Sequence, residues 1–275
     1  MAGVEVDYGT NGIATITFNR PKALNALTID DYNAFATALR EIDKRPDVFV
    51  TIWQAHGDWF SSGTDVREAA ARLNFAEGRD PSREVLPKSI WPTNTDTTEA
   101  LYSHSKVLVA ALQGPVMGIT AAFVSHCDII YCLPKTHLSV PFAALGLITE
   151  AGSSVAFVNR MGLSKANEAL LFRRQLDATA LLQCGFVNEI FPEQSPGSFH
   201  AAVRKRVETD LKGLHPPALL AIKKLIRTGL RDKNDPDLVN WRESQEQARR
   251  VATGIPARRF QATVEALAQA HKSKL

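Results

Sequence analysis

The sequence lacks the motifs that mark several common catalytic and nucleotide-binding sites. It contains no GxSxG nucleophile elbow, no Walker A loop, no GxGxxG turn and no HExxH helix. Its seven histidines show no metal-ligand spacing. These absences argue against an α/β-hydrolase, a P-loop nucleotidase, a dinucleotide-dependent enzyme and a zinc peptidase.

Cysteine is scarce, and no apolar run is long and unbroken. The three cysteines, Cys127, Cys132 and Cys184, are odd in number and form no CxxC pair. They predict a reducing compartment and neither a disulfide framework nor a zinc site. We expect a buried strand, helix and strand over residues 107–133, and not a membrane span. This most apolar stretch is interrupted by Gln113, Gly114, Pro115, His126 and Asp128.

Positive charge is concentrated toward the C-terminus. The chain has 275 residues, 45% of them hydrophobic, which suits one large globular domain with a helical appendage. The net charge is +3, but residues 206–275 hold 14 Lys and Arg against 8 Asp and Glu. This excess indicates either a surface that meets the phosphates of a nucleotide or nucleic acid, or a solvated helical face.

Two glycine-containing stretches stand out among the residues that are present: 60–65 (FSSGTD) and 113–120 (QGPVMGIT). Each places glycine where a strand should end and a helix should begin. Glycine allows close backbone approach, and a helix start carries unpaired N–H groups with partial positive charge. Two such sites that face one another can stabilise a single developing oxyanion.

Alternating strand and helix patterns predict an α/β fold with a mostly parallel sheet. We expect strands over residues 13–18, 48–53, 107–112 and 129–132, and helices over 28–44 and 118–126. Thr28 and Asp31 are spaced as a capping box. From Ser195 onward we expect helices only, with helix starts at Ser195-Pro196 and Asp235-Pro236.

Four blocks in a fixed order resemble the crotonase superfamily, which is also called the enoyl-CoA hydratases and isomerases. The blocks are residues 19–27, 60–65, 113–120 and 127–130, and the resemblance extends from about residue 6 to about residue 192. It implies a spiral of ββα units over residues 1–194. It also implies a C-terminal helical segment over residues 195–275 that completes the coenzyme A site and builds a homotrimer or a dimer of trimers.

The same resemblance assigns backbone and binding roles. The oxyanion N–H groups would belong to Thr64 and Ile119. Thr64 stands where the family often has alanine, and its side chain should narrow the site. The residues implied to contact the acyl-CoA substrate are Asn25, Ala26, Leu27, Ser62, Gly63, Gly118 and Phe142.

The acid–base residues separate the possible reactions. Hydratases of this superfamily use two glutamates, and this chain has Ala122 and Phe142 at those places. One carboxylate remains, Glu150, which matches the base of fungal-type peroxisomal Δ3,Δ2-enoyl-CoA isomerases. The competing interpretation is that Glu150 sits in the first turn of a helix and complements its dipole. Asn94 is expected to be either a helper of Glu150 or a loop and cap residue.

One base is sufficient to move a double bond, because the protons at C2 and C4 of the substrate lie on one face. An apolar lining would raise the pKa of Glu150 and a helix start would lower it. We therefore expect a Δ3,Δ2-enoyl-CoA isomerase that needs no cofactor or metal, since coenzyme A is part of the substrate. The alternatives are a dienoyl-CoA isomerase and a non-catalytic protein that binds acyl-CoA or RNA. Binding of nucleic acid is disfavoured, because no RNA motif accompanies the charge.

The sequence ends in Ser273-Lys274-Leu275. This tripeptide is the address that the peroxisomal import receptor reads. It predicts that the receptor is a partner and that the protein resides in the peroxisomal matrix.

Overall fold

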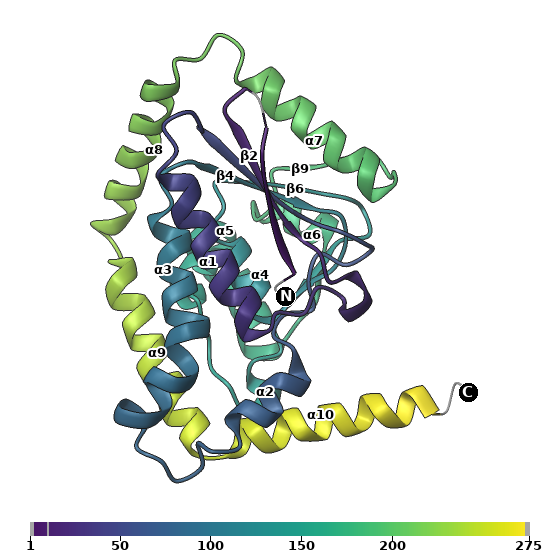
Figure 1. The fold of residues 1–275 in the computed structure, drawn as a ribbon, viewed down its shortest axis with the longest axis vertical. Helices are drawn as coiled ribbons and strands as arrows, with labels where there is room; N and C mark the ends of the chain where they lie inside the picture. Colours follow the sequence, from purple (N-terminus) through teal and green to yellow (C-terminus); the bar gives the residue numbers. More distant parts are fainter. Residues whose placement is uncertain (1–2, 10, 273–275) are drawn as a thin grey trace.

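The computed structural model describes residues 3–9 and 11–272, so the predicted targeting tripeptide lies outside the described residues. A six-stranded sheet in the order β1-β2-β3-β4-β6-β9 forms the centre of the molecule (Figure 1). Within this sheet the described strands pair parallel except β1 with β2, so the prediction of a mostly parallel sheet is confirmed. The strands are β1 (Val4–Tyr8), β2 (Ile13–Phe18), β3 (Val50–Ala55), β4 (Val107–Leu112), β6 (Ile129–Cys132) and β9 (Glu189–Ile190).

Helices connect the parallel strands, as the alternating pattern predicted. Helix α1 (Ile29–Asp43) joins β2 to β3, and it begins with the predicted capping box, in which Thr28 N donates to Asp31 Oδ2 at 2.9 Å. The connection from β3 to β4 contains α2 (Val66–Leu73), the π-helix η2 (Pro81–Thr95) and α3 (Asp96–Ser103). A 3-10 turn, η1 (Pro21–Ala23), precedes α1.

A second sheet consists of three short strands in the order β5-β7-β8. Strand β5 runs parallel to β7, and β7 pairs antiparallel with β8. The elements are β5 (Val116–Met117), α4 (Gly118–Val124), β7 (His137–Ser139), η3 (Ala143–Leu145), α5 (Ser153–Phe172), β8 (Leu176–Asp177) and α6 (Ala178–Gln183). Helix α4 is buried along nearly all of its length, as its small and apolar residues predicted.

Strand β1 was missed by the sequence prediction. It is an edge strand and most of its residues are exposed, so it lacks the buried alternation that identified β2. Its place is fixed by pairing with β2, in which Val4 lies opposite Phe18.

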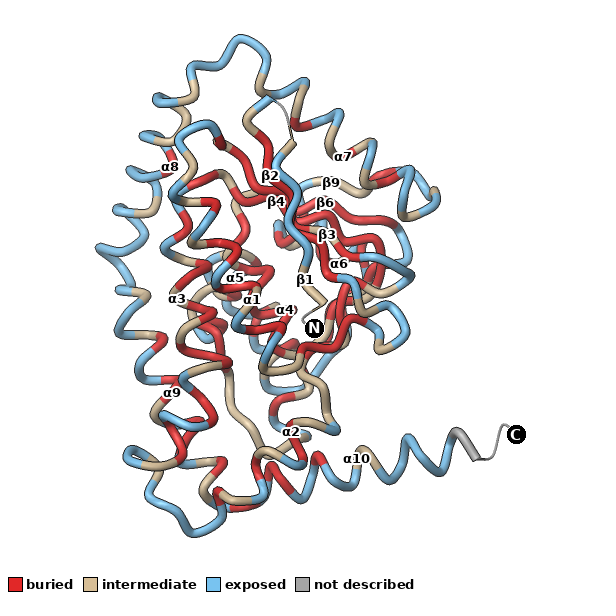
Figure 2. The backbone as a smooth tube through the Cα atoms, in the orientation of Figure 1, coloured by how far each residue is buried: buried red, intermediate tan, exposed pale blue. Residues whose placement is uncertain are grey.

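The largest hydrophobic core lies between the central sheet and helices α1, α4 and α5 (Figure 2). Aromatic rings organise one end of it. Phe35 and Trp53 have ring centroids 4.6 Å apart, and Phe60 lies 5.0 Å from Trp53. Phe60 begins the first glycine-containing stretch, so this packing anchors that loop to the sheet.

The described residues of the C-terminal segment form helices joined by short turns and contain no strand, as predicted. It consists of α7 (Pro196–Asp210), α8 (Pro216–Arg231), α9 (Pro236–Ala252) and α10 (Ile255–Lys272). Helix α7 covers the other face of the sheet through Phe199, Val203 and Val207. Figure 1 shows α8 and α9 along one side of the molecule and α10 extending past α2. Within the described ranges, no helix has the length and apolar character to cross a membrane.

A separate hydrophobic cluster joins the connection between β3 and β4 to the C-terminal helices. It unites α2 and η2 with α9 and α10, through residues that include Leu73, Ile90, Val251 and Phe260. Helix η2 contains two internal prolines, Pro87 and Pro92, and follows a short turn. Residues 81–95 are therefore a helix that packs against the C-terminal segment.

Candidate active site

The two glycine-containing loops meet backbone to backbone. Gly63 has φ +91° and Gly118 has φ +58°, a region that favours glycine. A Cβ added to Gly63 would lie 3.0 Å from the carbonyl oxygen of Met117 and 3.4 Å from Gly118 Cα. Met117 N donates to the carbonyl oxygen of Ser61 at 2.9 Å and links the loops. The close approach that the glycines predicted is therefore present.

The backbone N–H groups of Thr64 and Ile119 follow these glycines directly. Ile119 is the second residue of α4, where backbone N–H groups have no partner within the helix. Among the hydrogen bonds of the described residues, neither N–H has an acceptor. Two unpaired donors on touching loops are suited to an oxyanion.

The turn before α1 is hydrogen-bonded to the first of these loops and holds it in place. Asn25 is 1% exposed, and its Nδ2 donates to the carbonyl oxygens of His56 and Trp59 at 2.8 Å each. The Ser61 hydroxyl donates to the carbonyl oxygen of Asn25 at 2.8 Å and accepts from Gly63 N at 3.1 Å. The Asn25 side chain is thus committed to holding the turn, and a direct ligand contact by it stays a prediction.

The other predicted binding residues of this region lie against the same loop. Leu27 N donates to the carbonyl oxygen of Gly63 at 2.8 Å, and Ser62 N donates to that of Leu24 at 2.9 Å. Ala26 and Leu27 are buried, whereas Ser62 is half-buried. Contacts of Ala26, Leu27 and Ser62 with a ligand remain predictions.

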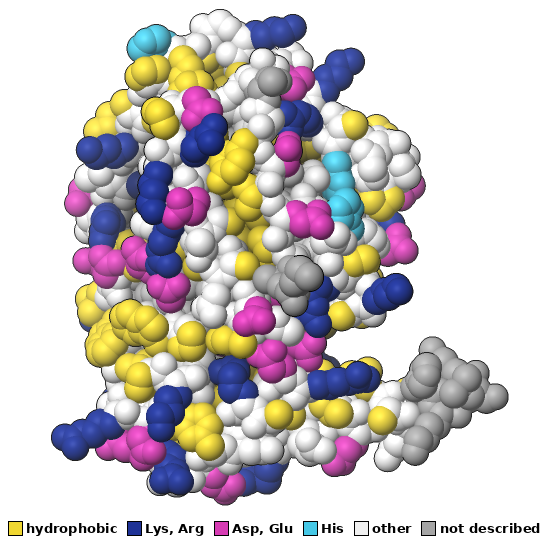
Figure 3. Space-filling view, in the orientation of Figure 1, with side chains coloured by type: hydrophobic (Ala, Val, Ile, Leu, Met, Phe, Trp, Pro, Cys, Tyr) yellow, Lys and Arg dark blue, Asp and Glu magenta, His cyan; other side chains and the backbone are white. Residues whose placement is uncertain are grey.

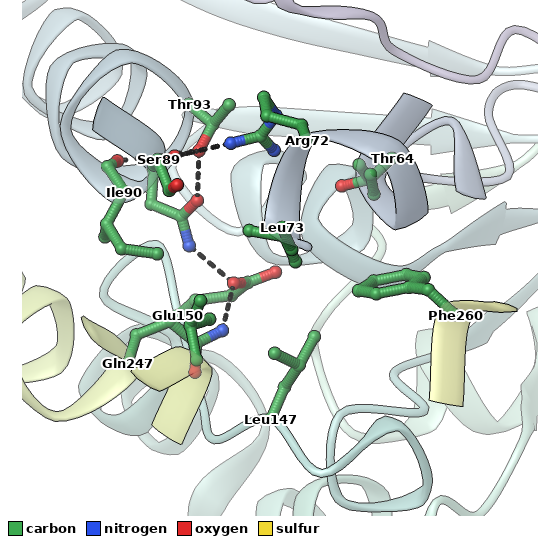
Figure 4. Close-up of a pocket in the computed structure, with 13 residues that line it drawn as sticks. Thr64, Arg72, Leu73, Ser89, Ile90, Thr93, Leu147, Glu150, Gln247 and Phe260 are labelled. Atoms are coloured by element: carbon green, nitrogen blue, oxygen red, sulfur yellow. Dashed lines mark hydrogen bonds between the residues drawn. The ribbon is translucent and has the colours of Figure 1, made fainter. Parts of the chain in front are cut away.

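A cavity of about 30 Å³ opens beside Thr64 (Figure 4). It collects residues from four helices and from the segment before α5, which are far apart in the sequence. The lining residues are Thr64, Ala69, Arg72, Leu73, Ser89, Ile90, Thr93, Asn94, Leu147, Glu150, Gln247, Val251 and Phe260. Ile119 is 2% exposed and lies outside this set.

Glu150 enters the cavity from a strained turn and not from a helix. Helix α5 begins at Ser153, and the two residues between have positive φ, +59° at Ala151 and +71° at Gly152. His126 supports the turn, since its Nε2 lies 2.7 Å from the carbonyl oxygen of Ala151. The competing interpretation, in which Glu150 occupies the first turn of a helix, is therefore wrong.

A different carboxylate complements the start of α5. Glu243, from α9, accepts from Gly152 N at 2.7 Å and from Ser154 N at 2.9 Å. Burial raises the pKa of Glu243, and the donors from the start of α5 act against this. The role of dipole partner thus belongs to Glu243, which leaves Glu150 available to the cavity.

Two amides hold one oxygen of Glu150. Asn94 Nδ2 donates to Glu150 Oε2 at 2.5 Å, and Gln247 Nε2 donates to the same atom at 2.8 Å. The amide of Gln247 is oriented by Ile148 N, which donates to its Oε1 at 3.1 Å, and that of Asn94 by the Thr93 hydroxyl. Figure 4 shows the second carboxylate oxygen directed away from the amides. The two oxygens of Glu150 therefore have different environments.

Burial determines the direction in which the pKa of Glu150 shifts, which the sequence alone did not decide. The side chain is 7% exposed, and burial raises its pKa to about 7. The two amide donors and Arg72 act in the opposite direction, and Glu243 adds to the increase. A carboxylate with this pKa can both accept and return a proton near neutral pH.

Ala122 and Phe142 are placed in the main hydrophobic core. They are 0% and 3% exposed, and neither lines the cavity. Phe142 therefore contributes to packing behind the site in this structure. A direct contact of Phe142 with the substrate stays a prediction.

Sequence reasoning missed Gln247 and Arg72, which reach the cavity from α9 and α2. Nothing in the local sequence marks Gln247, because its function depends on how α9 packs on η2. It also missed Tyr32, whose hydroxyl lies 2.6 Å from Thr64 Oγ1. That hydrogen bond ties down the side chain of Thr64, the residue expected to narrow the site.

Comparison with known proteins agrees with this geometry. The family model described as "Enoyl-CoA hydratase/isomerase" matches residues 9–246. A "Delta(3,5)-Delta(2,4)-dienoyl-CoA isomerase" from Pyricularia oryzae is 38% identical, over 94% of this chain and 96% of the relative. A "3,2-trans-enoyl-CoA isomerase" from Saccharomyces cerevisiae is 34% identical, over 87% and 86%.

The fold is also shared with solved structures. A crystal structure of an enoyl-CoA hydratase/isomerase from Pseudoalteromonas atlantica T6c superposes with a TM-score of 0.79. It is 26% identical, and the match covers 96% of this chain and 97% of that one. The chain therefore belongs to the enoyl-CoA hydratase/isomerase family, the crotonase superfamily that its sequence blocks predicted.

Proposed function

We propose that the protein is a Δ3,Δ2-enoyl-CoA isomerase of the β-oxidation of unsaturated fatty acids, which converts 3-enoyl-CoA to 2-trans-enoyl-CoA. The observation that carries this proposal is the single carboxylate of the cavity. Among the described residues that line it, Glu150 alone is acidic, and one of its oxygens is held by two amides while the other is not. The yeast relative named as a 3,2-trans-enoyl-CoA isomerase supports the same reaction.

The two carboxylate oxygens of Glu150 have different roles in the proposed reaction. Oε2 accepts two N–H groups, so Oε1 is the atom that takes the proton from C2 of the substrate and returns it to C4. General base catalysis of this kind contributes roughly 10²–10⁴-fold to the rate. Burial of the carboxylate supports the shuttle, because exclusion of water limits loss of the proton to solvent.

The dienolate formed between the two steps carries negative charge on the thioester oxygen. The N–H groups of Thr64 and Ile119 would donate to this oxygen from the touching glycine loops. A well-aimed donor stabilises such a transition state by about 2.7–4 kcal/mol. Gly63 and Gly118 act by permitting the approach, since a side chain at Gly63 would meet the opposite backbone.

Hydration of 2-enoyl-CoA is disfavoured by the same geometry. Adding water requires one group to activate the water and a second to deliver a proton. The positions that would supply these glutamates hold Ala122 and Phe142, both buried in the core. Glu243 is buried nearby, but its carboxylate is occupied by the N–H groups at the start of α5.

A dienoyl-CoA isomerase is the second candidate, and the relative from Pyricularia oryzae favours it by name. That reaction uses the same scaffold with more than one acidic residue, which the cavity does not provide among its described residues. Comparing 3-enoyl-CoA with 3,5-dienoyl-CoA as substrates of the purified protein separates the two. We expect faster turnover of 3-enoyl-CoA, and faster turnover of the dienoyl substrate would replace the proposal with the alternative.

A non-catalytic RNA-binding role receives little support. Figure 3 shows Lys and Arg side chains interspersed with Asp and Glu on the face in view, without one continuous basic surface. The cavity with its buried carboxylate is instead suited to a reaction.

We further propose that residues 1–194 form the catalytic spiral and that residues 195–275 complete the site and build a trimer or a dimer of trimers. Gln247 and Phe260 support the first role of the C-terminal segment, because both line the cavity. Exposed apolar side chains on α8 support the second, since Leu225 is 72% and Ile226 60% exposed.

The peroxisomal matrix is the proposed location, with the import receptor as a partner. A 31% identical mouse relative is named "Enoyl-CoA delta isomerase 3, peroxisomal". Deleting Ser273, Lys274 and Leu275 should abolish import and leave activity intact. Unchanged peroxisomal import of the truncated protein would contradict this role.

A further inference from the structure

The cavity that holds Glu150 also contains a cation, Arg72, that has no carboxylate within ion-pair distance among the described residues. Arg72, on α2, lines the cavity and is half-buried. Within the described part of the chain it forms no ion pair. Its Nη1 donates to the carbonyl oxygen of Ser89 at 2.9 Å. Its Nε is buried and has no acceptor among residues 3–9 and 11–272. Such a group is costly to bury unless a partner arrives.

Ser89 adds a second unsatisfied group to the same wall. It is fully buried, its hydroxyl has no hydrogen-bond partner among the described residues, and it lines the cavity. Figure 4 shows Arg72 and Ser89 on one side of the cavity, with Leu147 and Phe260 on the other. The part of the wall that Arg72 and Ser89 form is therefore polar, although Ala69, Leu73 and Ile90 of the same two helices are apolar.

The oxygen atoms common to every acyl-CoA do not account for this polar wall. The thioester oxygen has its own donors in the backbone of Thr64 and Ile119. The phosphates of coenzyme A are separated from the thioester by the pantetheine arm. Thr64 and Arg72 line one small cavity, so the phosphates lie outside it when the thioester is in place. Glu68 and Glu150 act on Arg72 through space and accept no hydrogen bond from it among the described residues, which leaves the acyl group as the source of a hydrogen-bonded acceptor.

We propose that the preferred substrates are 3-enoyl-CoA thioesters whose acyl chain ends in a carboxylate, and that Arg72 and Ser89 bind this carboxylate. The proposal rests on the isomerase function above and specifies its substrate class. A guanidinium donates two parallel hydrogen bonds to a carboxylate, and the serine hydroxyl supplies a third. The reaction stays balanced, because a C2–H bond breaks, a C4–H bond forms and the distal carboxylate is a spectator.

The test compares substrates matched in chain length, 3-hexenedioyl-CoA against 3-hexenoyl-CoA, together with a longer pair of the same kind. The measured quantity is the ratio of the two kcat/KM values within a pair. Charged hydrogen bonds of this type correspond to a preference of about 10- to 100-fold for the carboxylated substrate in at least one pair. The ratio is informative because Arg72 also lowers the pKa of Glu150, an effect that acts on both substrates alike.

Three variants complete the test. Arg72→Gln keeps a donor toward the Ser89 carbonyl and removes the charge, so the ratio should fall close to one. Ser89→Ala should lower the ratio several-fold. Arg83→Met removes an exposed arginine of η2 that does not line the cavity, and it should leave the ratio unchanged.

The outcomes distinguish this inference from the proposed function. A wild-type ratio near one in both pairs, or a preference that survives in Arg72→Gln, overturns the carboxylate site. The isomerase function still stands in that case, provided that the plain substrates are converted. Absence of isomerisation of all the substrates overturns both.

Discussion

The side-chain nitrogen of Asn94 lies 2.5 Å from Oε2 of Glu150, 56 residues away in sequence. This hydrogen bond brings the end of η2 against the turn that precedes α5. Gln247 donates to the same oxygen from α9, so the carboxylate is fixed at one atom by both halves of the chain. The remaining oxygen is the one available for proton transfer.

Replacing Glu150 with glutamine should abolish the base and preserve the site. The substitution Glu150→Gln keeps the size of the side chain and removes its basic oxygen. Turnover of 3-enoyl-CoA should fall by at least about 10²-fold, while binding of acyl-CoA largely persists. Steady-state kinetics and calorimetry check both parts. Near wild-type turnover would remove Glu150 from the mechanism.

The buried carboxylate should destabilise the fold as pH rises. The pKa of Glu150 is about 7 in the folded state against 4.5 as the ordinary value, so the folded chain retains this proton over a range in which the unfolded chain loses it. This contribution is fully present below pH 4.5, and about 3 kcal/mol of it is lost as pH rises through 7. The folding stability of the Glu150→Gln variant should not show this loss, because glutamine does not ionise. Denaturation at several pH values measures the difference between the two proteins, and a difference independent of pH would contradict the assignment.

Removing the Gln247 amide should shift the pH dependence of catalysis. The amide favours the ionised form of Glu150, so Gln247→Met should raise the pKa further and move the midpoint of kcat/KM upward by about one to two pH units. Gln245→Met is the matched control, since Gln245 lies on the same helix and contacts Ser82 instead. If Gln247→Met lowered the rate equally at every pH, its role would be structural only.

Adding a methyl group at Gly63 should damage the oxyanion site. The new Cβ would press on Met117 and Gly118 and displace the N–H of Thr64. Loss of one such donor corresponds to roughly 10²–10³-fold in turnover. Gly78→Ala is the control, because Gly78 also has positive φ, +72°, but its Cβ would meet nothing within 4 Å. Both variants carry backbone strain of about 1–2 kcal/mol, so equal losses of activity would argue against the oxyanion assignment.

Local sequence patterns were sufficient for much of the fold and for part of the site. Buried strands such as β2 and β4 and capped helices such as α1 follow from periodicity and end residues. Glu150 and Asn94 were found through resemblance, and the structure places them in contact. Strand β1 escaped detection because pairing with β2, and not its own pattern, determines it.

The rest of the site depends on contacts between segments that are distant in sequence. Gln247 becomes a partner of Glu150 only when α9 packs against η2. The start of α5 is complemented by Glu243, 89 residues from Ser154, which no local reading of Glu150 could indicate. Local sequence shows Arg72 only as a helix residue, and its place in a cavity without an ion pair to any described residue depends on the fold.

The most direct test of the account compares two rates of the wild-type protein, isomerisation of 3-enoyl-CoA and hydration of 2-enoyl-CoA. Glu150 is the one acidic residue among the described residues that line the cavity, and Ala122 and Phe142 occupy the places of the two hydratase glutamates. This arrangement predicts fast isomerisation and little hydration. Hydration as fast as isomerisation would contradict the roles given to positions 122, 142 and 150.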